Sequence, residues 1–413
     1  MVKYTELLEL IAVALHSNEG PDLAYLVRPT SPHGKDLFDS ASLSEPTLLL
    51  QRQSLRHYEG MIDSPWDEIT IQYVLVTSHI AKKRYLEAFK EHTTLVHLFY
   101  RFFEANNGWT LPVLFAILRD LRDLALDADV QIAGTGSESK MEDAARTIQK
   151  AFTLCMTDRT SPYQLSRKWG VYYVVGLIMK SYFRIRKISL SKSILRSLDA
   201  NTDMPALGAY PKSHQVTYRY YIGMLSFLNE DYTKAEKELT LAFYSCHNDA
   251  TNNRERILTY LIPLRILRGH LPSEELLVSF PALNELYSPF IEAIRSGNIR
   301  DYDDALNKWE LRLIDLNLYL TLEKARELSI RGLFRRVWVA SQKSNRVPVA
   351  MFHSASRISG QDVTLDEAEC LVANMIYRGY IRGYISHEKR MVVLANTNAF
   401  PRLADRPAPY NLY

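Results

Sequence analysis

Helical periodicity is the feature that most constrains the fold of this 413-residue chain. Residues 69–105 carry an apolar residue every three or four positions, and residues 111–130 continue the pattern with Pro112 in the first turn. That spacing gathers the apolar side chains on one face of a helix. Similar segments follow at 141–157 and 166–187. Because only 16 glycines and 17 prolines are present to interrupt helices, the sequence predicts a mainly α-helical fold.

Size and composition are those of a folded protein. The chain has room for two or three domains or for one extended repeat array, and 47% of its residues are hydrophobic. Residues 1–20 lack the basic start and cleavage site of a signal peptide, and no stretch approaches the ~18 apolar residues of a membrane span. The three cysteines are far apart and form no CxxC pair, which argues against a disulfide framework. We therefore expect a protein of the cytosol or nucleus that does not enter the membrane.

Residues 212–246 predict two antiparallel helices that approach each other closely. The spacing of their contact positions resembles a tetratricopeptide-type hairpin, because small residues let two helix backbones come near. These positions are Gly223, Ala235, Leu239 and Ala242. A tyrosine also stands three residues before an alanine at Tyr85, Tyr232 and Tyr302, either as a cap of the hairpin junction or by chance in a chain with 25 tyrosines. The repeats diverge, so we expect an irregular right-handed solenoid of helical pairs.

A second kind of pattern begins at Thr364. Thr364 followed by Glu367 predicts a capping box at the start of a helix. One apolar stripe at helical spacing then consists of Leu365, Ala368, Leu371, Val372, Met375 and Ile376. Gly379 stands where a left-handed cap that ends the helix needs no side chain.

Two short alternating runs follow this helix. Residues 380–385 place Ile381, Gly383 and Ile385 on one side, and 391–394 return after the charged turn 386–390. A shorter helix is expected upstream at 347–358. Helix, turn, helix and a two-stranded wing together predict a winged helix at the carboxyl end of the solenoid.

Positive charge is concentrated at the same end. From residue 331 to the carboxyl terminus, twelve Lys and Arg stand against six Asp and Glu, so this segment carries +6 and the rest of a +3 chain carries −3. The second helix presents Asp366, Glu367 and Glu369, which would repel phosphate in a DNA groove. The cations lie instead on the wing and in residues 331–346. They indicate either sequence-independent phosphate contact or an ordinary solvated basic face.

No group of residues converges into a catalytic, metal or cofactor site. His92 and His97 are five residues apart and fall on different faces of a helix, unlike the four-residue spacing of a zinc-binding helix. No glycine-rich stretch has the spacing of a nucleotide-binding loop. We expect no enzymatic activity and no cofactor.

The layout and several stretches resemble one known family. A helical solenoid that ends in a winged helix is the arrangement of PCI domains. Residues 167–175, 214–243, 257–277 and 371–394 are similar to the signalosome "subunit twelve-like" proteins and to the PCI subunits of the export complex TREX two. The similarity runs from about residue 60 to 403. The expected divisions are N-terminal helices (1–60), an N-terminal helical-repeat region (61–210), the helical part of the PCI domain (211–346), the winged helix (347–403) and a tail (404–413).

This resemblance implies a non-enzymatic nuclear scaffold subunit that couples transcription to mRNA processing and export. Its winged helix would pair with a larger PCI protein of the Sac or Thp kind, which a small acidic protein of the Sem/DSS type clamps. The implied pairing residues are Tyr380, Ile381, Tyr384, Ile385, Met391 and Val393. The implied contacts to RNA or DNA, without sequence preference, are Arg335, Arg336, Lys343, Arg346, Arg378, Arg382, Lys389 and Arg390.

One alternative stays open. The chain could serve a signalosome-like assembly and make only protein–protein contacts, because both groups of relatives share these motifs. The expected location is the nucleus, with the cytoplasm as the alternative.

Overall fold

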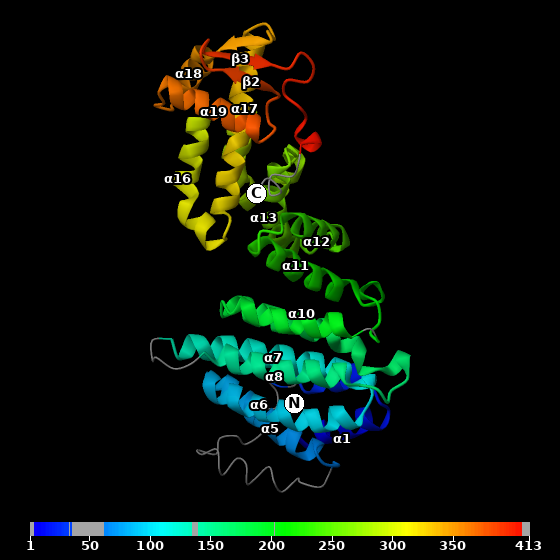
Figure 1. The fold of residues 1–413 in the computed structure, drawn as a ribbon. Helices are drawn as coiled ribbons and strands as arrows, with labels where there is room; N and C mark the ends of the chain where they lie inside the picture. The colour runs from blue at the N-terminus through cyan, green and yellow to red at the C-terminus, as the bar shows by residue number, and fades with distance from the viewer. Residues whose placement is uncertain (1–3, 33, 35–61, 134–138, 202, 407–413) are drawn as a thin grey trace. The chain divides into compact units, whose positions relative to one another are not determined.

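The computed structural model describes residues 4–32, 34, 62–133, 139–201 and 203–406. Half of the predicted region 1–60 and residues 407–413 of the predicted tail lie outside these ranges. The chain divides into two compact units, Met1–Tyr218 and Arg219–Tyr413, and the division falls within α11 (Lys212–Leu228). Figure 1 shows helices throughout both units and strands only in the second.

The N-terminal unit is a stack of helices. Helices that follow one another in the chain pack together: α5 on α6, α6 on α7, α7 on α8 and α8 on α9 (Figure 1). The bounds are α1 Tyr4–His16, α2 Gly20–Leu26, α5 Trp66–Ala81, α6 Tyr85–Ala105, α7 Leu111–Gln131, α8 Lys140–Met156, α9 Val171–Arg184 and α10 Ser191–Ala200. Short 3-10 turns connect them: η1 Gly108–Thr110, η2 Tyr163–Leu165, η3 Arg167–Gly170, η4 Ile188–Leu190 and η5 Leu207–Ala209.

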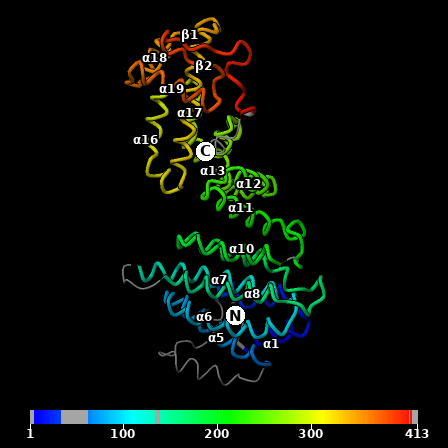
Figure 2. Tube along the Cα trace, viewed as in Figure 1, coloured from blue at the N-terminus to red at the C-terminus, as the bar shows by residue number. Residues whose placement is uncertain are grey.

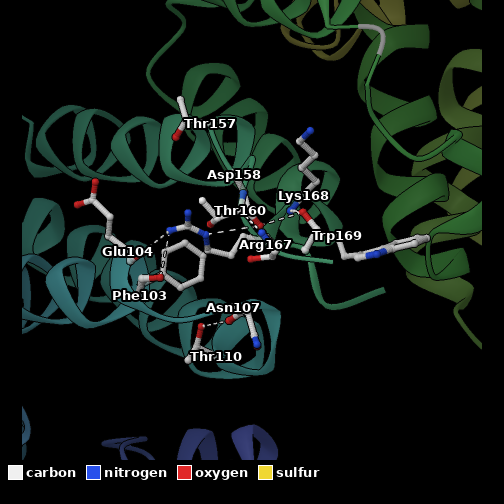
Figure 3. Close-up of polar contacts among 12 residues, drawn as sticks. Phe103, Glu104, Asn107, Thr110, Thr157, Asp158, Thr160, Arg167, Lys168 and Trp169 are labelled. Atoms are coloured by element: carbon white, nitrogen blue, oxygen red, sulfur yellow. Dashed lines mark hydrogen bonds and ion pairs between the residues drawn. The ribbon is translucent and has the colours of Figure 1, made fainter. Parts of the chain in front are cut away.

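A buried polar cluster fixes the turn between α8 and α9. The carboxylate of Asp158, 2% exposed, accepts hydrogen bonds from the amide of Arg167 at 2.8 Å and from the hydroxyl of Ser166 at 2.9 Å. Arg167 in turn donates to the carbonyls of Phe103 (3.1 Å) and Glu104 (3.2 Å), where α6 ends (Figure 3). Two charged groups are thus buried side by side. The Arg167 guanidinium donates through Nη1, while its Nε has no hydrogen-bond partner among the described residues. These contacts tie three helices together.

The C-terminal unit begins with a close helical hairpin. α11 packs its Gly223 against Leu239 of α12, where an added Cβ would lie 2.7 Å from Leu239 Cγ. This confirms the predicted close approach. Tyr85 and Tyr232 are the first residues of α6 and α12, and Tyr302 lies in the first turn of α16. The tyrosine–alanine pairs therefore mark helix starts.

The remaining helices of this unit lead to the winged helix. α16 and α17 pack against each other as an antiparallel pair (Figure 2). Several helices begin after a residue whose side-chain oxygen caps them. Such an oxygen accepts a hydrogen bond from one of the first backbone amides, which have no partner within the helix. Asp231, Ser273 and Asn298 accept from amides three residues on. The bounds are α12 Tyr232–Ser245, α13 Thr251–Leu267, α14 Glu274–Val278, α15 Pro281–Ser296, α16 Ile299–Asp315 and α17 Tyr319–Ala340.

The winged helix contains a three-stranded antiparallel sheet in the order β1-β3-β2. Its elements are β1 Arg346–Pro348, α18 Val349–Ile358, α19 Leu365–Tyr377, β2 Gly383–Ser386 and β3 Met391–Leu394, followed by η6 Leu403–Asp405. The capping box at Thr364 is confirmed, with both reciprocal hydrogen bonds present. Gly379 has φ +75°, as the predicted left-handed cap requires. The predicted helical solenoid ending in a winged helix is confirmed.

Two details of that prediction are wrong. The wing has three strands rather than two, because Val347 pairs with Val392 and so joins a strand to the other side of β3. The helix expected from 347 consequently begins at Val349. The strand expected from residue 380 begins only at Gly383, because the amides of Tyr380 and the next residue turn back to the carbonyl of Met375.

The winged helix is anchored to α17 through aromatic packing. Phe334 of α17 and Phe352 of α18 are both fully buried, with ring centroids 5.1 Å apart at an interplanar angle of 79°. This edge-to-face geometry is favoured for aromatic pairs.

Candidate partner and nucleic-acid surface

The sheet of the winged helix has one buried and one outward face. Residues directly opposite each other on antiparallel strands share a face. Val347, Val392 and Leu394 are buried on the inner side. Tyr384 lies opposite Val393, and this pair belongs to the outward face, where Tyr384 is 63% exposed.

The six residues predicted to bind a partner are divided by this arrangement. Tyr384, Met391 and Val393 share the outward face. Ile385 lies opposite Val392 and so belongs to the inner face, although it is half-buried.

Tyr380 and Ile381, also predicted for pairing, are 2% and 1% exposed. The guanidinium of Arg406 covers the Tyr380 ring at 3.6 Å from its centroid and donates to the carbonyl of Arg378. Burial raises the pKa of Tyr380. In this conformation both residues support the winged helix from within and offer almost no surface to another chain.

The predicted nucleic-acid residues lie at separate places. Lys389 and Arg390 occupy the β2–β3 turn, and Arg382 lies at the opposite end of β2. The four residues of β2 span about 13 Å. Lys343 lies in the turn after α17 and Arg346 begins β1. All five side chains are exposed, so the structure places cations at both ends of the outward face of the sheet.

Arg378 differs from the other predicted cations. It is half-buried and forms an ion pair with Glu327 of α17. Its charge is thereby compensated within the protein, which makes it a poorer phosphate contact than an exposed arginine.

Arg335 and Arg336 lie away from the sheet, on the exposed side of α17. They line a hollow together with Arg295 and Arg331. Arg295 was not predicted, because it comes from α15 and no local pattern connects it with α17. Arg331 belongs to the basic segment 331–346 but was not among the predicted contacts, although its spacing of four residues from Arg335 places both on one face of α17.

One of the acids predicted to repel phosphate has a partner. His387 Nδ1 in the β2–β3 turn lies 2.8 Å from Glu369 Oε1 of α19. This hydrogen bond, with the charge of the carboxylate, raises the pKa of His387. The contact connects the turn that carries Lys389 and Arg390 to α19.

We expect an NMR titration to give His387 a pKa above the ordinary histidine value of about 6.5. The raised pKa means that the contact is strongest when His387 is protonated and weakens as the pH rises through that pKa. Glu369→Gln should lower the pKa of His387, whereas Glu388→Gln, in the same turn, serves as the control. An unchanged His387 pKa in Glu369→Gln would show that the contact does not persist in solution.

Within the described ranges, no group of three or more His, Cys, Asp or Glu side chains is placed to hold a metal ion. No helix there is both long and apolar enough to cross a bilayer.

Paired helices followed by a winged helix are the arrangement of the PCI class of protein. The sequence pattern of the PCI domain matches residues 306–396, which begin in α16 and end just after β3.

Comparisons over most of the chain agree with that class. A Schizosaccharomyces pombe protein called "Protein CSN12 homolog" is 38% identical over 360 residues, which are 83% of this chain and 85% of that protein. A Neurospora crassa protein of the same name is 41% identical over 328 residues, 71% of this chain and 72% of the relative. The Xenopus laevis "PCI domain-containing protein 2" is 31% identical over 409 residues, 98% of each chain. The chain belongs to the PCI-domain family that these relatives represent.

Proposed function

We propose that this chain is a non-enzymatic scaffold subunit of a nuclear PCI complex that couples transcription to mRNA processing and export. Its winged helix docks a second, larger PCI protein of the Sac or Thp kind, and a small acidic Sem/DSS-type protein holds that partner. Basic side chains of the winged helix and α17 add affinity for RNA or DNA without sequence preference.

The observation that carries the proposal is the outward face of the sheet. An exposed tyrosine next to half-buried methionine and valine is the composition found at the centre of protein interfaces. Tyr384, Met391 and Val393 form such a group, and Arg346 lies on the same face. Cations at both ends of β2 would then form the polar rim, where long-range attraction to an anionic chain acts.

The mode of nucleic-acid contact follows from charge. α19 presents Asp366 and Glu367 to solvent, so insertion of this helix into a groove is disfavoured. Exposed arginines and lysines on turns and sheet ends suit contact with the phosphate backbone, which carries no sequence information. We therefore expect binding that depends on salt and not on base sequence.

Docking can be tested with paired substitutions at exposed tyrosines. Tyr384→Asp places a charge in the middle of the outward face and should reduce recovery of the larger PCI partner from cells by about tenfold or more. The control is Tyr377→Asp, because Tyr377 is 77% exposed at the end of α19, outside the sheet. Equal recovery of the partner with both variants would show that the outward face of the sheet is not part of the interface.

Nucleic-acid binding can be tested by salt titration. Changing Arg382, Lys389 and Arg390 together to Glu should weaken single-stranded RNA binding and reduce the salt slope by about 2, since each lost phosphate contact accounts for about 0.7. The control reverses three exposed cations of the N-terminal unit, Lys82, Lys83 and Arg84, with the same change in net charge. Equal slopes for both variants would mean that only net charge matters.

A second candidate is a subunit of a signalosome-like assembly that makes only protein–protein contacts. The ion pair of Arg378 with Glu327 and the acids of α19 favour it, because they reduce the positive surface of the winged helix. This candidate predicts that the larger PCI partner is recovered as before while RNA affinity stays undetectable at physiological salt.

A further inference from the structure

Four arginines line one hollow between α15 and α17. The hollow has a volume of about 470 Å³ and receives Arg295 from α15 and Arg331, Arg335 and Arg336 from α17. Leu328 and Leu403 contribute apolar parts of the wall. Among the residues that the structure describes, no acidic one belongs to the lining. The positive charges of these arginines repel one another. An anion bound in the hollow would reduce that repulsion and so stabilise the protein.

The arginines are held in place by bonds that leave their charges in the hollow. Arg336 donates to the carbonyl of Arg295 at 3.0 Å, and Arg331 donates to the carbonyl of Pro401 at 2.7 Å. Both acceptors are neutral carbonyls, which orient a guanidinium without cancelling its charge. The Nε of Arg331 is buried and lacks a hydrogen-bond partner among the described residues. The fixed ends of these side chains reduce the entropy lost when a ligand binds.

The environment of Arg331 disfavours its positive charge in the absence of an anion. Burial lowers its pKa, and the neighbouring charges of Arg335 and Arg406 lower it further. Glu274 pairs with Arg295 of the hollow at 3.2 Å and is itself 83% exposed. A surface ion pair of this kind contributes little, so Arg295 can exchange Glu274 for a ligand oxygen.

We infer that this hollow is a phosphate-binding site. Guanidinium groups bind phosphate oxygens in a bidentate manner, and several of them converging on one point suit a ligand with several negative charges. A single carboxylate would leave most of the positive charge uncompensated. The phosphate can belong to an RNA chain, a source that rests on the proposed function, or to a free polyphosphate, which does not.

Inorganic tripolyphosphate is the probe for the site, with isothermal titration calorimetry on the full chain. We expect one molecule to bind per protein chain. Arg335→Gln and Arg295→Gln should each weaken binding by about tenfold or more, because each removes a charge-assisted contact. Glu274→Gln should strengthen binding a few fold, since it releases Arg295. The control is Arg312→Gln, at an exposed position of α16 outside the hollow.

The outcomes separate this inference from the proposed function. No binding of tripolyphosphate, or equal affinity in Arg335→Gln and Arg312→Gln, overturns the phosphate site whatever the protein does with RNA. If tripolyphosphate binds as expected and a single-stranded RNA oligonucleotide displaces it, the site takes backbone phosphates. If it binds as expected and RNA does not displace it, the site holds a free polyphosphate, and the role of RNA is decided by the salt titration alone.

Discussion

Replacing Asp158 by alanine should lower the free energy of unfolding of the N-terminal unit by about 3–5 kcal/mol. The reason is that Asp158 is the acceptor for a whole turn: besides Arg167 and Ser166, two further amides of the turn donate to its Oδ1. Without the carboxylate these donors are left unpaired, and the buried guanidinium of Arg167 loses the charge that lies 3.7 Å from its Nε. Chemical denaturation measures the loss, and hydrogen exchange of the α9 amides locates it.

Asp203→Ala is the matched control for this substitution. Asp203 also forms an ion pair, with Lys168 at 2.7 Å, but its side chain is 88% exposed. The side chain of Lys168 is only 9% exposed, but in Asp203→Ala its ammonium keeps the hydrogen bond to the backbone carbonyl of residue 203 at 3.1 Å. This variant should therefore lose clearly less stability than Asp158→Ala. If Asp158→Ala lost no more stability than Asp203→Ala, the buried cluster would not be what holds the turn.

The same carboxylate should make stability depend on pH. Burial by itself would raise the pKa of Asp158, but the hydrogen bonds from Arg167, Ser161 and Ser166 outweigh it and hold the pKa well below its usual range. A depressed carboxyl pKa contributes stability above the unfolded value of about 3.9, and that contribution disappears as the pH falls toward the folded value. Between about pH 4 and pH 2, the stability of Asp158→Ala should therefore change less steeply than that of the parent.

A structural feature could be predicted from the sequence where the contacts that determine it are between residues close together in the chain. The cap at Thr364, the stripe of α19 and the left-handed Gly379 were predicted, because each depends on residues within one or two turns. β1 was missed because three residues are too few to show a pattern and are a strand only through pairing with β3. Strands defined by distant partners leave little trace in their own sequence.

The same distinction applies to the candidate sites. Lys389 and Arg390 could be located from sequence, since they lie on a turn between two recognisable strands. The burial of Tyr380 could not, because Arg406 covers it from the other side of the wing. The arginine hollow depends on the meeting of α15 and α17, whose contact follows from packing and not from spacing along one helix.

The second large effect is expected at the junction between α17 and the winged helix. Phe352→Ala should lower the free energy of unfolding of the C-terminal unit by about 3–5 kcal/mol, because it removes a fully buried ring and leaves a cavity against Phe334. Met351→Ala is the control, since the neighbouring side chain is 39% exposed and its loss leaves no closed cavity. Denaturation measures both changes.

This junction also determines how the surface of the sheet is presented. α18 packs on both α17 and α19, so loosening α18 should release the sheet as well. Recovery of the larger PCI partner should therefore fall in Phe352→Ala even though the substituted residue is buried and cannot touch that partner. Faster hydrogen exchange across β2 and β3, together with unchanged exchange in α5–α8, would locate the effect in the winged helix. If Phe352→Ala were as stable as Met351→Ala, the aromatic pair would not be the anchor, and the winged helix would depend on its carboxyl-terminal contacts, such as the bond from Arg331 to Pro401.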